Sequence, residues 1–253
     1  MTDARVQEIV DAVTAALAGV VRERAVTEAE WYAALDFVGK VAAAGELILL
    51  SDVLRLSVLV DRQEHADDGS SPTNVLGPFW RDAPVLPAVD GVASLVGPDE
   101  PGERMVLQGR VTGAGGVPLP GAALDVWQCG ADGLYDVQRP DLAGAPHLRG
   151  VVAAGADGRY AVTTVVPPPY EVKKDGPVGR LLAALGRHAF RPAHIHLKVT
   201  ADGHRPLVTQ AFLAGDPWFG DDTIGADDPG CVIALDPSTT PPTATFDITL
   251  ASA

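Results

Sequence analysis

The distribution of proline and glycine divides the chain into two parts of different character. Residues 3 to about 66 hold no proline and only three glycines, although the whole chain has 21 prolines and 27 glycines. Because both residue types interrupt helices, the first part is predicted to be helical. The remainder is rich in turn-forming residues, which favours short strands. We therefore expect a fold of mixed α and β class.

Three helical segments are expected in the first part. Thr27 and Glu30 have the spacing of a capping box, so the second helix should begin near Glu28. The third segment, from about residue 46 to 64, carries more apolar surface than one helix of a small bundle hides. That surface is expected either to contact the part that follows or to mediate self-association. In the first helix the predicted apolar stripe consists of Val6, Ile9, Val10, Val13 and Leu17.

A polar stretch at residues 65–74, with one glycine and one proline, marks the end of the helical part. We therefore expect two domains, a helical domain over residues 1–74 and a β-rich domain over residues 75–253. Alternating apolar runs separated by turn signals are typical of an antiparallel β-sandwich. The predicted strands are 105–111, 122–128, 160–165, 195–199, 207–212 and 244–250.

Composition and charge narrow the classes of partner. A formal net charge of −14 argues against nucleic acid, because binding phosphate requires a basic surface. Charged residues interrupt the longest apolar stretches, so no transmembrane helix is expected. The polar, mixed-charge N-terminus does not resemble a secretion signal, and the two cysteines, Cys129 and Cys231, are too few for a disulfide scaffold. A cytoplasmic protein is the expectation.

The sequence Arg191-Pro-Ala-His-Ile-His-Leu-Lys-Val199 contains the most informative pair of residues. On a strand, His194 and His196 would project from the same face, so that two imidazoles converge. Imidazole binds zinc, copper, iron and nickel alike. No carboxylate lies near the pair in sequence, and the cysteines are too few for a thiolate zinc site. The pair therefore predicts a metal site without choosing the metal.

Tyrosine is the remaining anionic candidate ligand. Tyr135, Tyr160 and Tyr170 all lie upstream of the histidines, and a phenolate oxygen is a natural match for a hard ion such as Fe(III). A single tyrosine is more often a buried, hydrogen-bonded ring than a ligand. The residues alone do not select among the three.

Other polar residues are candidate neighbours of such a site. Arg191 would place a permanent cation beside the histidines, and Gln210 could donate a hydrogen bond to the same region. There is no phosphate-binding loop and no nucleophile elbow. The acidic loop lacks the spacing of a calcium-binding loop, so it is interpreted as solvated turns. Its acidic residues are Asp216, Asp221, Asp222, Asp227 and Asp228.

Several motifs in a fixed order give the chain a resemblance to the intradiol ring-cleaving dioxygenases, the catechol and hydroxyquinol 1,2-dioxygenases. The resemblance covers nearly the whole chain. The motifs are LGPFW at 76–80, PLPGAALDVWQCGADGLYDVQ at 118–138, LRG at 148–150, DGRYAVTTVVPPPY at 157–170, the segment 175–199 that contains RPAHIH, and TQAFLAGDPW at 209–218.

The resemblance implies a non-haem Fe(III) site and assigns its ligands. By motif they are Tyr135 in GLYD, Tyr170 in PPPY, and His194 and His196 in RPAHIH. Tyr160 falls at a position that is not a ligand in the family. Tyr170 would also accept a proton from a catechol-type substrate. The family further implies that O2 is the second substrate and that the ring opens between its two hydroxylated carbons.

The resemblance also implies roles around the iron. Arg191 and Gln210 would stabilise negative charge on the activated substrate. Asp52 could accept a hydrogen bond from a third ring hydroxyl, and the GLYDVQ and VLGPF sequences are closer to the hydroxyquinol and chlorocatechol branch than to the catechol branch. Hydroxyquinol is therefore the expected substrate, with catechol or a substituted catechol as the alternative. Lys173 and Lys174 depart from the family pattern at the pocket edge. The implied pocket residues are Leu49, Asp52, Val53, Gly77, Pro78, Phe79, Val172 and Ile224.

The family resemblance offers an explanation for the apolar helices. Its members form homodimers through the N-terminal helical part, often with a phospholipid in an apolar tunnel, and both are expected here. Two alternatives remain: a divalent-metal hydrolase that uses His194 and His196 alone, and a non-catalytic β-sandwich that binds a carbohydrate or a protein partner.

Overall fold

The computed structural model describes residues 3–66 and 68–253. These residues form two compact units, residues 3–46 and Leu47–Ala253. No helix in the described part of the chain combines the length and the apolar character that a membrane span needs. Cys129 and Cys231 are both free thiols and both buried.

The first unit contains two helices, α1 (Asp3–Glu23) and α2 (Glu28–Ala43). The predicted capping box is confirmed at the start of α2: the Glu30 amide donates to the Thr27 hydroxyl (3.3 Å), and the Thr27 amide donates to the Glu30 carboxylate (2.8 Å). Each helix keeps large apolar side chains exposed. They are Val6, Ile9, Val10, Val13, Leu17 and Val20 on α1, and Trp31, Tyr32, Leu35 and Val38 on α2.

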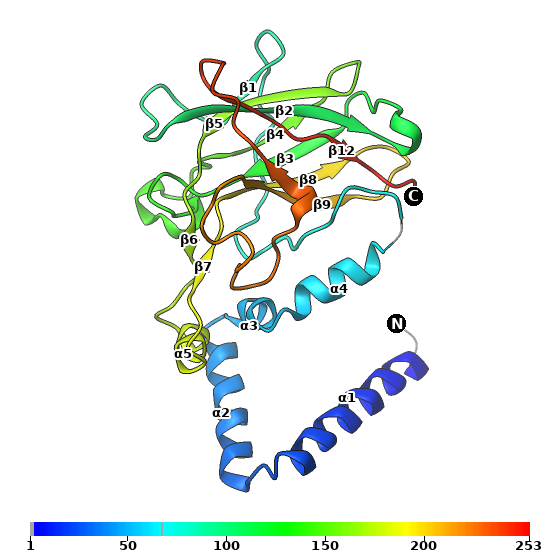
Figure 1. Ribbon diagram of the computed structural model, residues 1–253, viewed down its shortest axis with the longest axis vertical. Coiled ribbons are helices and arrows are strands. Elements are labelled where there is room, and N and C mark those ends of the chain that lie inside the picture. The colour runs from blue at the N-terminus through cyan, green and yellow to red at the C-terminus, as the bar shows by residue number, and fades with distance from the viewer. Residues whose placement is uncertain (1–2, 67) are drawn as a thin grey trace. The chain divides into compact units, whose positions relative to one another are not determined.

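The second unit opens with two short helices in place of the single predicted segment. α3 (Leu47–Val53) and α4 (Leu56–Glu64) are separated at Arg55, whose φ of 62° lies in the left-handed region and interrupts the helix. A fifth helix, α5 (Pro177–Ala184), lies beside α3 (Figure 1).

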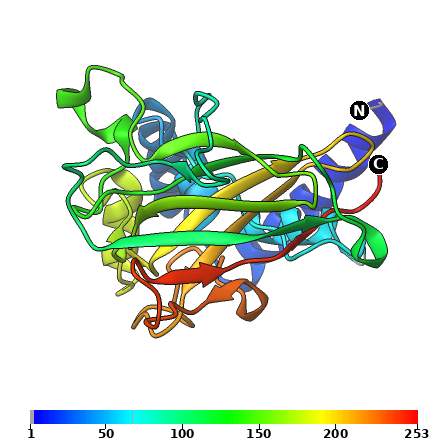
Figure 2. The same cartoon turned by 90° about the horizontal axis from the view of Figure 1, so that it is seen from above.

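Two five-stranded sheets form the body of the second unit. The first has the order β1-β5-β2-β11, with β12 also paired to β2, and the second has the order β10-β9-β8-β3-β4. Figure 1 shows β2 and β5 in the upper layer and β3, β8 and β9 beneath them, and Figure 2 shows the long strands from above. The strand bounds are β1 Ala93–Ser94, β2 Arg104–Thr112, β3 Ala123–Trp127, β4 Arg149–Ala153, β5 Arg159–Val165, β8 His194–Thr200, β9 Leu207–Leu213, β10 Val232–Ile233, β11 Thr243–Thr245 and β12 Ile248–Thr249.

The expected antiparallel arrangement is present only in part, because the sheets are mixed. The ladders between the long strands are antiparallel, whereas β1, β10, β11 and β12 each pair in parallel with a neighbour. These parallel strands are only two or three residues long, and loops rather than hairpin turns bring them to their partners. A third, two-stranded sheet joins β6 (Tyr170–Glu171) to β7 (Phe190–Arg191) in antiparallel fashion.

The predicted strand at 244–250 is broken at Phe246 and Asp247 for a visible reason. The Phe246 carbonyl accepts a hydrogen bond from the Tyr160 hydroxyl (2.7 Å) and approaches Gly109 so closely that a side chain there would clash. The Asp247 carboxylate accepts from the Arg110 amide (2.9 Å). The bend therefore follows from a close approach that only glycine permits.

One hydrophobic core joins the two five-stranded sheets. It includes Met105 and Leu107 from β2, Val162 from β5, and Ile195 and Leu197 from β8. Ile195 and Leu197 point into this core from one face of β8, which leaves His194 and His196 on the other face. Packing of the core therefore fixes the direction of both imidazoles.

Candidate metal centre and active site

The two histidines lie on a central strand and are both buried. β8 is flanked by β3 and β9, and the exposed fractions of His194 and His196 are 1% and 2%. Their Nε2 atoms are 3.1 Å apart. The convergence expected from the alternating geometry of a strand is therefore present.

Each imidazole is held in a different way. Nδ1 of His194 donates to the Pro192 carbonyl oxygen (2.7 Å), which leaves the Nε2 lone pair directed at the site. The His196 ring stacks on the Trp127 indole, with ring centroids 4.7 Å apart and an interplanar angle of 10°. Trp127 is fully buried, so this stack fixes the ring plane of His196.

Tyr135 brings an oxygen atom to the two nitrogens. Its hydroxyl oxygen lies 3.1 Å from Nε2 of His196 and 3.5 Å from Nε2 of His194. Tyr135 follows the loop after β3, and its ring stacks on Phe79 with centroids 4.4 Å apart. Three potential donor atoms therefore lie within one small volume.

Tyr170 borders the same volume from β6. Its ring centroid lies 5.4 Å from that of Tyr135 and 5.6 Å from that of His194. In the β6–β7 pair, Tyr170 is the direct partner of Arg191. Tyr160 lies elsewhere, in β5, where its hydroxyl is bonded to Phe246. The structure therefore brings Tyr135, Tyr170, His194 and His196 together and leaves Tyr160 outside.

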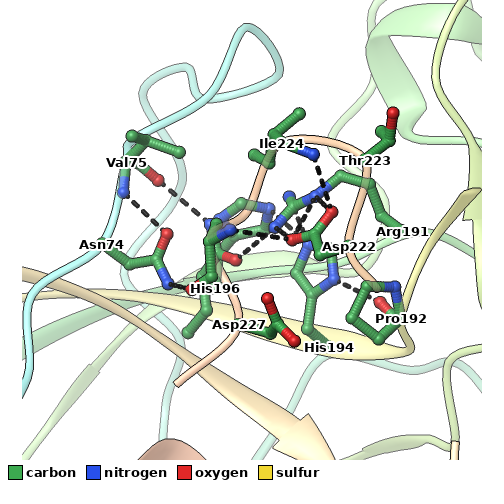
Figure 3. A network of polar contacts seen from close by, with 12 residues as sticks. Asn74, Val75, Arg191, Pro192, His194, His196, Asp222, Thr223, Ile224 and Asp227 are labelled. Carbon is green, nitrogen blue, oxygen red and sulfur yellow. Dashed lines mark hydrogen bonds and ion pairs between the residues drawn. The ribbon is translucent and has the colours of Figure 1, made fainter. Parts of the chain in front are cut away.

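Arg191 connects the histidines to a buried polar network (Figure 3). Its Nη1 lies 3.1 Å from Nε2 of His194, and its Nη2 donates to the Gln210 side-chain oxygen (2.8 Å). Nε and Nη2 also donate to the Asp222 carboxylate at 3.2 and 3.0 Å. The Gln210 side-chain amide donates to the Val75 carbonyl oxygen (3.1 Å).

Burial sets the protonation of the four candidate ligands. Burial and the nearby Arg191 cation hold the pKa of His194 and of His196 well below the usual range for histidine. Burial and the neighbouring Tyr170 raise the pKa of Tyr135 well above that of a free phenol, and burial also raises the pKa of Tyr170. At neutral pH the site therefore offers two neutral nitrogens and two phenols that ionise when a cation displaces their protons.

This donor set fits a hard, highly charged metal ion. Two unprotonated imidazole nitrogens and a phenol oxygen point at one another, an arrangement that a bound cation explains better than mutual hydrogen bonding. No group of three histidine, cysteine or carboxylate side chains that could hold a metal occurs among residues 3–66 and 68–253. The tyrosines are therefore needed to complete a metal site here.

The expected pocket residues lie on four segments: α3, residues 77–79, the residue after β6 and the 222–226 loop. Asp52 and Val53 are buried on α3, which also carries the half-buried Leu49. The 77–79 segment borders the donor set: a Cβ on Gly77 would lie 3.7 Å from the His196 ring, and Phe79 stacks on Tyr135. Pro78 lies between these two residues. Val172 and Ile224 are both buried, and the Ile224 amide donates to Asp222 (3.2 Å).

In the described part of the second unit, Asp52, Asp61 and Asp125 each have a buried carboxylate oxygen without a hydrogen-bond partner, and Asp52 is the most deeply buried of the three. Only 3% of Asp52 is exposed. Burial raises its pKa, while Ser57 and the charge of Arg191 oppose that rise. An unsatisfied buried carboxylate oxygen is costly unless a ligand bonds to it.

The interpretation of the acidic loop as solvated turns is wrong for Asp222. This residue is 1% exposed and paired with Arg191, because the loop folds back over the site. Sequence reasoning also missed Asp136 and Arg149, which form a second buried ion pair directly after Tyr135. In each pair one member lies near a predicted ligand in the sequence, Asp136 directly after Tyr135 and Arg191 three residues before His194, and this was the available signal.

Comparison with known proteins agrees with this geometry. Residues 77–252 match the model of the family described as Dioxygenase, and residues 3–71 match that described as Catechol dioxygenase N terminus. The chain is 42% identical over 229 residues to a hydroxyquinol 1,2-dioxygenase from Rhizobium sp. (strain MTP-10005), covering 88% of this chain and 76% of the relative. It is 36% identical to a chlorocatechol 1,2-dioxygenase from Pseudomonas putida, covering 87% and 83%.

Solved structures lead to the same family. A 3-chlorocatechol 1,2-dioxygenase from Rhodococcus opacus matches with a TM-score of 0.89 and 30% identity, covering 100% of both chains. A hydroxyquinol 1,2-dioxygenase from Pseudomonas putida matches with the same TM-score and identity, covering 100% of this chain and 94% of that one. The chain therefore belongs to the intradiol ring-cleavage dioxygenase family.

Proposed function

We propose that this protein is an Fe(III)-dependent hydroxyquinol 1,2-dioxygenase. The observation that carries the choice of substrate is Asp52, a buried carboxylate with an unsatisfied oxygen on the helix expected to line the pocket. It can accept a hydrogen bond from the third hydroxyl of benzene-1,2,4-triol, which catechol lacks. The hydroxyquinol dioxygenase relative at 42% identity supports this choice.

A chlorocatechol 1,2-dioxygenase is the second candidate. Relatives with that activity are 36% identical to this chain, and a solved 3-chlorocatechol 1,2-dioxygenase shares its fold with a TM-score of 0.89. A halogen on the ring would leave the Asp52 oxygen without a donor. The two candidates therefore differ in what they require of that carboxylate.

The iron would be held by Tyr135, Tyr170, His194 and His196. The two histidines are neutral donors, and the two phenols become anionic by losing protons to solvent. When bound, ferric iron supplies a Lewis-acidic centre that draws electron density from a chelated catechol-type ring and so prepares it for attack by O2. The His194–Pro192 bond and the Trp127 stack hold the imidazoles ready for that ion.

Tyr170 would move the proton that substrate binding releases. Without a bound ion, burial raises the pKa of its phenol. We therefore expect its phenolate, when it does not bind the ion, to take a proton from a ring hydroxyl. Arg191 would then stabilise the negative charge of the deprotonated substrate, because its Nη1 faces the site beside His194. Both amide atoms of Gln210 bond to Arg191 and Val75, which supports a role for Gln210 in holding Arg191 rather than in contacting substrate.

The pocket would be formed around this centre by the helix and loop residues named above. Phe79 packs on Tyr135 and Gly77 lies against the His196 ring, so the 77–79 segment would enclose one side and exclude water. Leu49, Asp52 and Val53 would enclose another side. Pro78, Val172 and Ile224 would complete the apolar wall.

The exposed apolar residues of α1 and α2 support a homodimer formed through the N-terminal helices, with a phospholipid held among them. On this proposal, residues 1–74 form the helical dimerisation domain and residues 75–253 the catalytic domain, whose two sheets and shared core support a sandwich. A monomer found by sedimentation at micromolar concentration would contradict the dimer.

A substrate panel tests the function. The iron-loaded protein should consume O2 with hydroxyquinol, and product absorbance should identify maleylacetate, the ring-opened product. We expect kcat/KM for hydroxyquinol to exceed that for catechol and for 3-chlorocatechol. A higher value for 3-chlorocatechol would favour the second candidate, and no ring opening with any of the three would refute the proposal.

A further inference from the structure

The Arg191–Asp222 pair is almost completely enclosed by protein. The side chains of Arg191 and Asp222 are 4% and 0% exposed. Removing one member of such a pair leaves a buried charge without compensation, which is strongly destabilising. The ion pair between the Arg191 guanidinium and the Asp222 carboxylate is therefore expected to stay formed in the folded protein.

The pair leaves one edge of the guanidinium directed at the site. Asp222 accepts from Nε and Nη2, and Gln210 accepts from Nη2 as well. Nη1 is the nitrogen that faces Nε2 of His194 (3.1 Å). Because the guanidinium is planar and its donors have fixed directions, binding the Nε–Nη2 edge determines where Nη1 points.

The same carboxylate also orders the loop that follows it. Asp222 accepts from the amides of Ile224 (3.2 Å) and Ala226 (3.3 Å), and Figure 3 shows its carboxylate between Arg191 and the Ile224 amide. The Ala226 carbonyl oxygen accepts from the Asn74 side chain (2.6 Å). Asp222 thus links the guanidinium, the 222–226 loop and the start of the 75–80 segment.

We propose that Asp222 is a positioning residue: it binds the Nε–Nη2 edge of Arg191 so that Nη1 is directed at the negative charge that develops on the substrate. The inference rests on the proposed function, in which Arg191 stabilises that charge. Asp222 itself contacts neither the substrate nor the candidate ligands. Its effect on turnover passes chiefly through Arg191; the amides of Ile224 and Ala226 are the other groups that its carboxylate binds.

The test is a double-mutant cycle on the iron-loaded protein with Asp222→Asn and Arg191→Gln. A displaced donor costs about 100-fold in rate, so Asp222→Asn should lower kcat by roughly that factor and change KM far less. In the Arg191→Gln background, Asp222→Asn should change kcat less than about threefold, because no guanidinium is left to orient. The visible absorption band of the iron site should stay in place in every variant.

Unfolding in urea gives a readout that does not depend on turnover. Each single variant should lower the urea midpoint of both iron-loaded and metal-depleted protein, and the double variant should recover part of that loss. Should Asp222→Asn fail to fold, recovery of folding in the double variant would support the pairing, and its absence would refute it.

Asp228→Asn is the matched control. Asp228 also caps a loop, accepting from the Gly230 amide (2.8 Å), and it lies outside the Arg191 network. We expect wild-type kcat for this control. Equal loss from Asp222→Asn in both backgrounds, or full kcat in the single variant, would refute the inference while the wild type remains active. An inactive wild type would instead refute the proposed function.

Discussion

Two buried arginines, Arg149 and Arg191, use their guanidinium groups differently. All three nitrogens of Arg149 donate to protein: Nε to Asp136 (2.6 Å), Nη2 to Asp136 and to the Phe79 carbonyl oxygen (2.8 Å), and Nη1 to the Arg81 carbonyl oxygen (3.4 Å). Arg191 binds Asp222 through one edge and directs Nη1 at His194. The difference is consistent with a structural role for Arg149 and, on the proposed function, with a role for Arg191 in the reaction.

The different positions of the Arg149–Asp136 and Arg191–Asp222 pairs explain this difference between the two arginines. Asp136 follows Tyr135 directly, and the Phe79 ring stacks on Tyr135. Arg149 therefore fastens the two segments that hold this tyrosine in place. The Asp222–Arg191 pair instead contacts the histidines, because Nη1 of Arg191 lies beside Nε2 of His194.

The largest expected effect is on turnover by Arg191→Ala. Removing one preorganised donor from a developing anion costs about 100- to 1000-fold in kcat. Oxygen uptake at saturating hydroxyquinol measures this loss. Arg149→Lys, which keeps a cation at the structural pair, serves as the control and should retain kcat within about tenfold in the fraction that folds. A similar kcat for Arg191→Ala and wild type would remove the distinction between the two arginines.

Next in size is a loss of stability at Asp136. Asp136→Ala leaves the buried Arg149 cation without its partner and should lower the free energy of unfolding by about 3–5 kcal/mol. Urea unfolding of the metal-depleted protein measures this without any contribution from iron. A loss below about 1 kcal/mol, the size found for an exposed pair, would show that the Arg149–Asp136 pair does not hold the fold.

The same pair predicts a pH dependence. Burial alone would raise the pKa of Asp136, but hydrogen bonds from Arg149 and Arg81 outweigh it and hold this pKa below the usual aspartate value. Its stabilising contribution is therefore complete above the unfolded-state pKa of about 3.9 and is lost as pH falls through the lower folded-state pKa. The stability gap between wild type and Asp136→Asn should accordingly shrink in that acid range. A gap that is constant down to the acid limit would contradict the assignment.

A third carboxylate sharpens the comparison because it has no paired arginine. Asp52 is buried like Asp136 and Asp222, yet no ion pair satisfies its free oxygen in the described structure. Asp52→Ala should lower kcat/KM for hydroxyquinol by about 10-fold or more and change that for catechol much less, because one charge-assisted hydrogen bond is lost. Steady-state kinetics with both substrates measure the ratio. Equal losses would remove the reason for preferring hydroxyquinol.

Local patterns made part of this structure predictable. The capping box at Thr27 and the shared face of His194 and His196 depend only on short-range geometry, and both are present. The break between α3 and α4 at Arg55 was missed, because a left-handed arginine leaves no signal in an apolar run. The parallel edge strands were missed because loops, rather than hairpin signals, place them.

Long-range contacts separate residues that residue type alone could not distinguish. Residue type alone did not distinguish the three tyrosines. The β6–β7 pairing places Tyr170 opposite Arg191. The Phe246 carbonyl, which lies close to Gly109, accepts a hydrogen bond from the Tyr160 hydroxyl. The sequence suggested that Asp222 is solvated, because its ion-pair partner, Arg191, lies 31 residues away and gives no local signal. Such choices follow from the register of the sheets, which local sequence does not encode.

The visible absorption spectrum of the iron-loaded protein tests the central claim most directly. Phenolate bound to ferric iron absorbs visible light, so the wild type should be red to burgundy. Tyr135→Phe or Tyr170→Phe should alter or remove the band. Tyr160→Phe should leave it in place, because the Tyr160 hydroxyl bonds to the Phe246 carbonyl oxygen and not to the site. A colourless wild type that contains zinc, or a band lost in Tyr160→Phe and retained in Tyr135→Phe, would contradict the account.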